Sequence, residues 1–111
     1  MYKEKSKYAR VFDPSCKDWE DCQEYNVVYL KAQQNYFNDI LRNRGYVFLR
    51  DVYECLGFPV TRTSLFVGWH YDQTNAFVDN YIDFDIHAKE DGNGIELDFN
   101  VDGDITNRFK D

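Results

Sequence analysis

The chain has 111 residues, of which 43% are hydrophobic and 18% are aromatic, and its formal net charge is −7. This length fits one domain, and the apolar content excludes a chain that is disordered by composition. The acidic charge argues against direct binding to nucleic acid or to an anionic membrane, because both would repel it.

The charge is distributed unevenly along the chain. Residues 1–50 carry nine Lys or Arg and seven Asp or Glu, whereas residues 51–111 carry four and thirteen. The first half therefore has a net charge of +2 and the second half −9. An acidic half attracts cations and basic protein surfaces, and net charge also keeps a protein in solution. Both interpretations stay open at this point.

The three cysteines, Cys16, Cys22 and Cys55, follow no regular framework, which argues against a disulfide-stapled secreted domain. The basic N-terminal residues are not followed by an apolar region, so they do not resemble a signal peptide. No apolar run approaches the roughly 20 residues of a membrane span. We therefore expect a cytoplasmic protein with reduced thiols and no cofactor.

The N-terminal part of the chain is predicted to form a charged tail, residues 1–12, before a single domain, residues 13–111. Asp13 followed by Pro14 is typical of a helix start, since it offers a capping side chain and then proline at the first helical position. This pair predicts a short helix that continues through Trp19.

A long helix is predicted from residue 24 to residue 43. Apolar residues recur there at three- and four-residue steps, which is the period of a helix with one buried face. Gln33 and Gln34 interrupt this pattern, and Gly45 is the expected left-handed terminator. The apolar positions are Val27, Leu30, Phe37, Ile40 and Leu41.

Shorter elements are predicted after the long helix. Tyr46–Leu49 is expected to be a short strand, and Val52–Leu56 a short helix with Asp51 as its cap. Thr61–Trp69 is rich in β-branched and aromatic residues, which favours a strand. Residues 72–80 contain the turn-forming residues of a loop.

Two strands with strictly alternating character are predicted from residue 82 and from residue 95, joined by a loop with the sequence KEDGNG. Alternation with period two indicates one buried and one solvent-facing side. The arrangement of helices before strands predicts an α+β fold, with one long helix and short helices packed on an antiparallel sheet of about three to four strands. The expected outward positions include Asp83, Asp85, Glu96, Asp98 and Asp102.

This acidic side of the hairpin is the main candidate for function. Ten acidic residues and one basic residue lie between Tyr71 and Ile105. Carboxylates at strand spacing can imitate the phosphates of a nucleic acid and so bind a basic protein surface. Tyr81 would then serve as an aromatic anchor. The alternative is a solvated face that only protects the sheet edge and keeps the chain in solution.

A calcium site is a further alternative, because the segment from Asp98 matches the start of an EF-hand loop. The match fails at the twelfth position, where Phe109 stands instead of a bidentate Glu, and the flanks are predicted strands rather than helices. The candidate ligands are Asp98, Asn100, Asp102 and Asp104.

Catalytic motifs are not apparent in the sequence. The only histidines, His70 and His87, lie in predicted strands. No nucleophile elbow, phosphate loop or dinucleotide fingerprint occurs. Paired carboxylates are abundant, but a small sheet offers little cleft for them. We therefore expect a protein that binds rather than an enzyme.

The chain resembles an uncharacterised domain family of phages and prophages from Gram-positive bacteria. The resemblance covers about residues 8–109 and rests on the stretches YARVFD, EYNVVYLKAQQNYFNDILRNRG, FLRDVYECLGFP, VGWHYD, DNYIDFDI and ELDFNVDGDI. Many members appear with a hydrophobic segment ahead of the domain that is not seen here, so we expect no membrane-linked role.

The resemblance implies a phage or mobile-element origin and a place in the host bacterial cytoplasm. It raises the hypothesis of an anti-CRISPR-like inhibitor that binds a host nuclease or CRISPR effector stoichiometrically through the acidic face. The alternative is a structural or assembly accessory protein of the phage particle, which would form homo-oligomers through exposed aromatic residues. Calcium-dependent binding is a weaker alternative.

Overall fold

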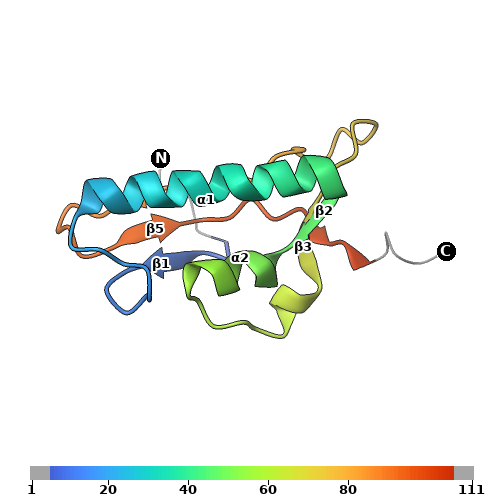
Figure 1. Cartoon of the computed structure of the whole chain (residues 1–111). Helices are drawn as coiled ribbons and strands as arrows, with labels where there is room; N and C mark the ends of the chain where they lie inside the picture. The colour runs from blue at the N-terminus through green and yellow to red at the C-terminus, as the bar shows by residue number, and fades with distance from the viewer. Residues whose placement is uncertain (1–5, 107–111) are drawn as a thin grey trace, which may run out of the picture.

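The computed structural model describes residues 6–106, and Figure 1 shows their arrangement. Within these residues, two α-helices lie over two antiparallel sheets of three strands each, which confirms the predicted α+β class. The strands thus divide between two small sheets rather than forming one. The first sheet has the order β1 (Arg10–Phe12), β5 (Ile95–Leu97) and β4 (His87–Ala88). The second has the order β2 (Tyr46–Phe48), β3 (Val67–His70) and β6 (Gly103–Asp104).

Of the segment predicted as a tail, residues 1–5 lie outside the described residues. The end of that segment forms β1, which pairs with the central strand of the first sheet from Arg10 opposite Leu97 to Phe12 opposite Ile95. Phe12 is fully buried, so β1 contributes to the core as well as to the sheet.

The long helix α1 spans Gln23–Arg44, within one residue of the predicted bounds at each end. Its buried positions include Leu30, Phe37 and Leu41, as the three- and four-residue spacing predicts. Gly45 ends the helix with a φ of 93° and donates its backbone N–H to the carbonyl of Leu41 at 2.8 Å. The left-handed terminator is therefore confirmed.

The second helix α2 spans Leu49–Leu56 and begins directly after β2, three residues before the predicted start. The prediction that Asp51 caps this helix is wrong. Phe48 occupies the N-cap position and makes no side-chain cap bond. Asp51 lies in the first turn instead, where its carboxylate is 3.6 Å from the guanidinium of Arg44.

The prediction of a short helix after Pro14 is also wrong, because residues 14–18 form turns. The Asp13 carboxylate accepts hydrogen bonds from the backbone N–H of Ser15 at 3.0 Å and from its hydroxyl at 2.5 Å. The backbone N–H of Cys16 donates to the Asp13 carbonyl at 2.9 Å. A capping side chain can close a single turn as well as begin a helix, and here it closes a turn.

Only the end of the strand predicted at Thr61–Trp69 is present, since β3 begins at Val67. Residues Thr63–Leu65 form a 3₁₀-helix, η1. The hydroxyl of Ser64 accepts from the N–H of Thr61 at 3.0 Å and donates to the Thr61 carbonyl at 2.6 Å. These local bonds fold a β-prone stretch into a turn. Residues 72–80 form turns without a regular element, as predicted.

A cluster of buried hydrophobic residues connects α1, α2 and both sheets. Its aromatic part is joined by edge-on ring contacts, with centroids 5.2 Å apart for Phe84 and Phe99 and 5.9 Å apart for Tyr53 and Phe99. The largest fully buried side chains include Trp69, Tyr53, Phe12, Phe84, Leu30 and Leu41. The acidic segment before β4 and the acidic segment after β5 are therefore both anchored in a well-packed core.

Candidate functional site

The segment that carries Asp83 is held against α1 by side chains of the helix. Asn38 accepts the backbone N–H of Ile82 at 2.7 Å and donates to its carbonyl at 2.9 Å. Gln34 accepts the backbone N–H of Phe84 at 2.8 Å. The side chains of Ile82 and Phe84 are fully buried, so Asp83 between them points to the opposite side.

The predicted hairpin is less regular than its alternation indicates. Ladder pairing of β4 with β5 is confined to His87 and Ala88. Asp85 interrupts it with a φ of 49°, and its backbone N–H donates to the carboxylate of Asp83 at 2.8 Å. The two segments stay together because the backbone N–H of Asp98 donates to the carbonyl of Phe84 at 3.0 Å.

Three of the predicted acidic residues come together around one surface depression of about 420 Å³. Asp83 and Asp85 approach it from one segment, and Asp98 from the other. The carboxylate of Asp98 accepts a hydrogen bond from the hydroxyl of Ser6 at 2.6 Å. The depression is lined by Ser6, Tyr8, Asp83, Asp85, Asp98, Phe99, Asn100 and Val101.

Glu96 lies beside this depression rather than within it. It stands opposite His87 in the β4–β5 pair, and both line a neighbouring shallow surface with the loop that joins the strands. The imidazole Nε2 of His87 is 2.9 Å from the carboxylate of Asp85, which is 39% exposed. The imidazole therefore contacts the Asp85 carboxylate where the depression and the neighbouring surface meet.

Asn100 positions the acidic segment through a network of four hydrogen bonds, of which the two that it accepts are partly buried. Its side-chain oxygen accepts the indole N–H of Trp69 at 2.9 Å and the backbone N–H of Asp83 at 2.7 Å. Its amide nitrogen donates to the carboxylate of Asp79 at 2.9 Å and to the carbonyl of Tyr81 at 3.1 Å. The side chain of Tyr81, the predicted aromatic anchor, is half exposed.

Asp102 was predicted on the solvent-facing side, but its side chain is only 6% exposed and faces β3. Its carboxylate accepts the backbone N–H of His70 at 3.0 Å and lies 3.5 Å from the imidazole Nδ1. That Nδ1 is buried and has no hydrogen-bond partner among the described residues. Burial raises the pKa of the Asp102 carboxyl, and the hydrogen bond from His70 partly offsets this rise.

The raised pKa of Asp102 predicts a pH-dependent effect of Asp102→Asn. Because the folded chain holds this proton more tightly than the unfolded chain, the contribution of Asp102 to stability is present at low pH and lost as pH rises. The variant keeps an oxygen acceptor but carries no charge. We expect its free energy of unfolding, relative to wild type, to increase between about pH 3 and about pH 6.

Urea titrations at several pH values measure this difference directly. The control is Asp91→Asn, which removes the same charge from an exposed position in the loop between β4 and β5. A relative stability of D102N that stays constant or declines over this pH range would contradict the expectation.

The four candidate calcium ligands are separated by their local contacts. Asp98 accepts a hydrogen bond from the Ser6 hydroxyl. Asn100 and Asp102 instead accept hydrogen bonds from Trp69 and His70 of β3. The carboxylate of Asp104 accepts the N–H of Thr106 at 2.8 Å. Within residues 6–106, no group of three or more His, Cys, Asp or Glu side chains is arranged to hold a metal ion. Phe109, at the twelfth loop position, lies outside the described residues.

Two of the three thiols, those of Cys16 and Cys55, offer little nucleophilic character. All three cysteines are free, and burial raises the pKa of both Cys16 and Cys55. A buried thiol with a raised pKa is mostly protonated at neutral pH, and the thiolate is the reactive form.

Sequence reasoning did not identify the residues that position the acidic site. Gln34 and Asn38 lie on the helix face that packs towards Ile82 and Phe84, and Asn100 lies beneath Asp83. The sequence feature that could have identified them is an amide side chain within or next to an apolar pattern. Such a residue needs a partner when it is buried, and the partner here is backbone from a distant segment.

Comparison with known proteins identifies a family without an assigned function. The model for a family of unknown function, DUF6353, matches residues 1–108. No curated protein and no solved structure matches the chain. In the described part of the chain, neither helix combines the length and apolar character that crossing a bilayer requires.

Proposed function

This chain belongs to the DUF6353 family, whose function is unknown, and we propose that it is a binding protein that engages a basic macromolecular surface. The observation that carries this proposal is the gathering of Asp83, Asp85 and Asp98 around one depression. Carboxylates from two chain segments meet there on the acidic half of the chain. This is the arrangement that an incoming Arg or Lys side chain would neutralise.

Repulsion among the three carboxylates at the depression favours binding of a cationic partner. Like charges on neighbouring segments of a sheet oppose one another, and a partner's guanidinium or ammonium group relieves that repulsion. The acidic half of the chain would also accelerate association with a basic surface at low salt. Tyr8 and Val101, both partly exposed, line the same depression and offer apolar surface for the stem of an Arg or Lys side chain.

More specifically, the proposed role of this chain is that of an inhibitor encoded by a phage or mobile element. It would act in the host bacterial cytoplasm, where the acidic site would occupy the nucleic-acid groove of a defence protein such as a nuclease or CRISPR effector. The support for this form is the resemblance to phage and prophage domains together with the carboxylate arrangement. A pull-down with the tagged chain from a host lysate tests it: the captured protein should be a nucleic-acid-binding protein that elutes as salt rises.

Removal of charge at the depression is expected to weaken binding to a basic probe by at least about tenfold, because charge-assisted contacts are lost. The variant is the triple Asp83→Asn, Asp85→Asn and Asp98→Asn. It keeps one oxygen acceptor at each position, which suffices for the hydrogen bonds from the Asp85 N–H and from the Ser6 hydroxyl, and asparagine tolerates the positive φ at Asp85. The measurement is fluorescence anisotropy of a labelled arginine-rich peptide at low salt.

The matched control removes the same number of charges from exposed positions elsewhere. Glu20→Gln, Glu24→Gln and Glu54→Gln lie before α1, in α1 and in α2. If this control weakens binding as much as the first triple variant, net charge rather than the depression determines affinity, and the proposed site is wrong.

A structural or assembly role in the phage particle is the second candidate function. The observation that favours it is the exposure of large aromatic side chains, above all Phe77, which is 96% exposed in the loop of residues 72–80. Mass spectrometry of purified particles separates the two functions, because an inhibitor would be absent from them.

A further inference from the structure

A small pocket next to the start of β1 carries positive charge. It has a volume of about 210 Å³ and is lined by Lys7, Tyr8, Arg10, Tyr53, Thr61 and Thr63. Two of these six residues are cationic and none of the six is acidic. Among residues 6–106, neither Lys7 nor Arg10 takes part in an ion pair. On a chain with a net charge of −7, this pocket is therefore a local positive site.

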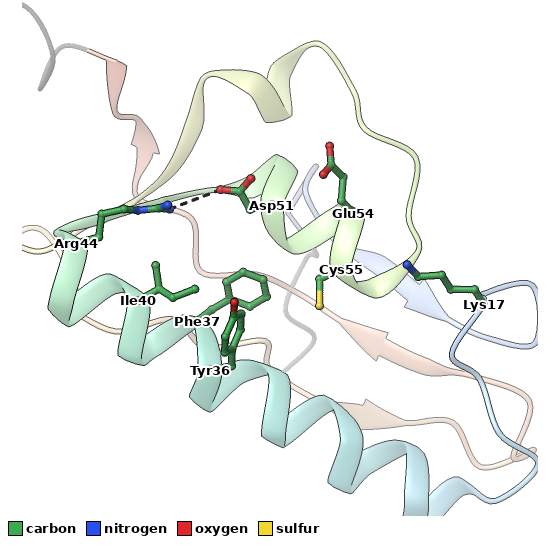
Figure 2. A pocket seen from close by; sticks show the side chains of 8 residues that line it. All are labelled: Lys17, Tyr36, Phe37, Ile40, Arg44, Asp51, Glu54 and Cys55. Atoms are coloured by element: carbon green, nitrogen blue, oxygen red, sulfur yellow. Dashed lines mark ion pairs between the residues drawn. The ribbon is translucent and has the colours of Figure 1, made fainter.

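The larger groove between α1 and α2 differs from this pocket in its charge. The groove has a volume of about 530 Å³, and its lining includes the cations Lys17 and Arg44 and the acids Asp51 and Glu54. Figure 2 shows the ion pair between Arg44 and Asp51 at one end of the groove. An anion that entered the groove would meet two carboxylates and a cation that is already paired. The smaller pocket is therefore the better anion site.

The guanidinium group of Arg10 is held in place by the protein itself. Its Nη1 donates to the carbonyl of Ala9 at 2.7 Å and to the carbonyl of Lys7 at 3.2 Å. Its Cζ lies 4.8 Å from the ring centroid of Tyr53, which is fully buried. Within the part of the chain that the structure describes, Nη1 is the only nitrogen of this group that donates a hydrogen bond. Nε and Nη2 can therefore donate to a ligand.

Hydroxyl groups from the segment before β3 complete the set of donors. The side-chain oxygen of Thr61 accepts the backbone N–H of Ser64 at 3.2 Å, so the hydroxyl proton remains available for another acceptor. Thr63 belongs to the turn η1 and is exposed. The ammonium group of Lys7 lies 5.4 Å from the ring centroid of Tyr8. A ligand would thus be contacted by two chain segments, residues 7–10 and residues 61–63.

We propose that this pocket binds a phosphate group, either as the free ion or as a phosphomonoester. The fork of an Arg side chain matches the geometry of phosphate oxygens, and Lys adds a point charge. A tetrahedral phosphate presents its oxygens in several directions, which suits donors from two segments better than a planar carboxylate does. The pocket is smaller than the roughly 300–1,000 Å³ of sites that enclose a drug-sized ligand, so it suits a single small group.

The net negative charge of the chain does not prevent this binding. The Debye length at physiological ionic strength is about 8 Å, so exposed carboxylates farther from the pocket than this are largely screened. The two cations of the pocket act at contact distance instead. Tyr8 lines both this pocket and the acidic depression, so the two sites are neighbours of opposite charge.

The test is an NMR titration of the isotope-labelled full chain with sodium phosphate, at neutral pH and constant ionic strength. The backbone N–H signals of Thr61 and Thr63 and the Nε–H signal of Arg10 should shift and saturate, with a Kd of about 1–10 mM. Sodium acetate should bind at least about tenfold more weakly, because it is planar and has two oxygens. Methyl phosphate distinguishes the two sources: tighter binding than phosphate supports an ester ligand, and weaker binding supports the free ion.

Lys7→Gln and Arg10→Gln should each weaken phosphate binding by at least about fivefold, because each removes a charge-assisted contact. Lys7 is exposed, so K7Q tests the pocket even if R10Q disturbs the packing against Tyr53. The matched control is Lys31→Gln, which removes the same charge from an exposed position in α1 and should leave the affinity unchanged.

Three results would overturn the proposal. The first is a set of shifts that stay linear up to about 50 mM phosphate, which would show no specific site. The second is a K31Q chain that loses as much affinity as K7Q, because net charge alone would then determine binding. The third is acetate binding equal to that of phosphate. The triple variant at Asp83, Asp85 and Asp98 should bind phosphate at least as tightly as wild type, which keeps this test independent of the acidic site.

Discussion

Gly68→Ala is expected to destabilise the chain by more than about 3 kcal/mol or to prevent stable folding. A Cβ atom at Gly68 would lie 2.1 Å from the carbonyl oxygen of Val47 and 2.8 Å from the Cα of Phe48. Both atoms belong to the backbone of β2, which pairs with β3 at this position. The clash therefore requires the two strands to separate, because no side-chain rotation relieves it. Thermal and urea unfolding of the purified variant measure the loss.

Gly94→Ala provides the matched control. A Cβ atom there would approach Val11 Cγ1 at 3.0 Å and Lys89 Cδ at 3.3 Å, both in side chains that can move. We expect a cost below about 1 kcal/mol. Equal losses for the two alanine variants would contradict the assignment of the Gly68 effect to the close approach of β2 and β3.

Asn100→Ala is expected to have the second largest effect, a loss of about 2–4 kcal/mol in the free energy of unfolding. The substitution leaves the indole N–H of Trp69 and the backbone N–H of Asp83 without their acceptor. Trp69 is 1% exposed, so water cannot readily replace the lost bond. A buried donor without a partner costs about 1–3 kcal/mol, and the partly buried N–H of Asp83 adds a smaller cost, which together account for the expected range.

The same substitution should also weaken binding to the arginine-rich peptide, because Asp83 loses the bond that fixes its backbone. Asn93→Ala, at an exposed position in the loop between β4 and β5, should change stability by no more than about 0.5 kcal/mol. Urea titration gives the stability of both variants. An N100A chain as stable as N93A would show that the network around Asn100 does not support the fold.

The elements predicted best from sequence were those with a strong local pattern and a clear terminator. The apolar spacing and Gly45 located α1 to within one residue at each end. Alternation correctly assigned Ile82, Phe84, Ile95 and Leu97 to the core. It did not predict the burial of Asp102, because alternation assumes one continuous pleat, and here the chain passes from β5 in one sheet to β6 in the other.

The missed features depend on contacts between distant segments. Thr61 and Ser64 are typical of strands or loops, and only their reciprocal bonds turn the chain before β3. Gln34 interrupted the apolar pattern of α1, yet it binds backbone 50 residues away in the chain. The gathering of Asp83 and Asp98 followed from the predicted hairpin, whereas the positioning role of Asn100 required the three-dimensional structure.

The binding of residues 82–84 to helix side chains also bears on aggregation. An extended segment at the margin of a sheet usually leaves backbone N–H and carbonyl groups that can recruit a strand from another molecule. Here Asn38 and Gln34 occupy those groups on Ile82 and Phe84, so α1 blocks the margin without an additional strand. A fibril-forming contact at this margin would first have to displace the helix. The resistance of the chain to aggregation therefore depends on two amide side chains, Asn38 and Gln34.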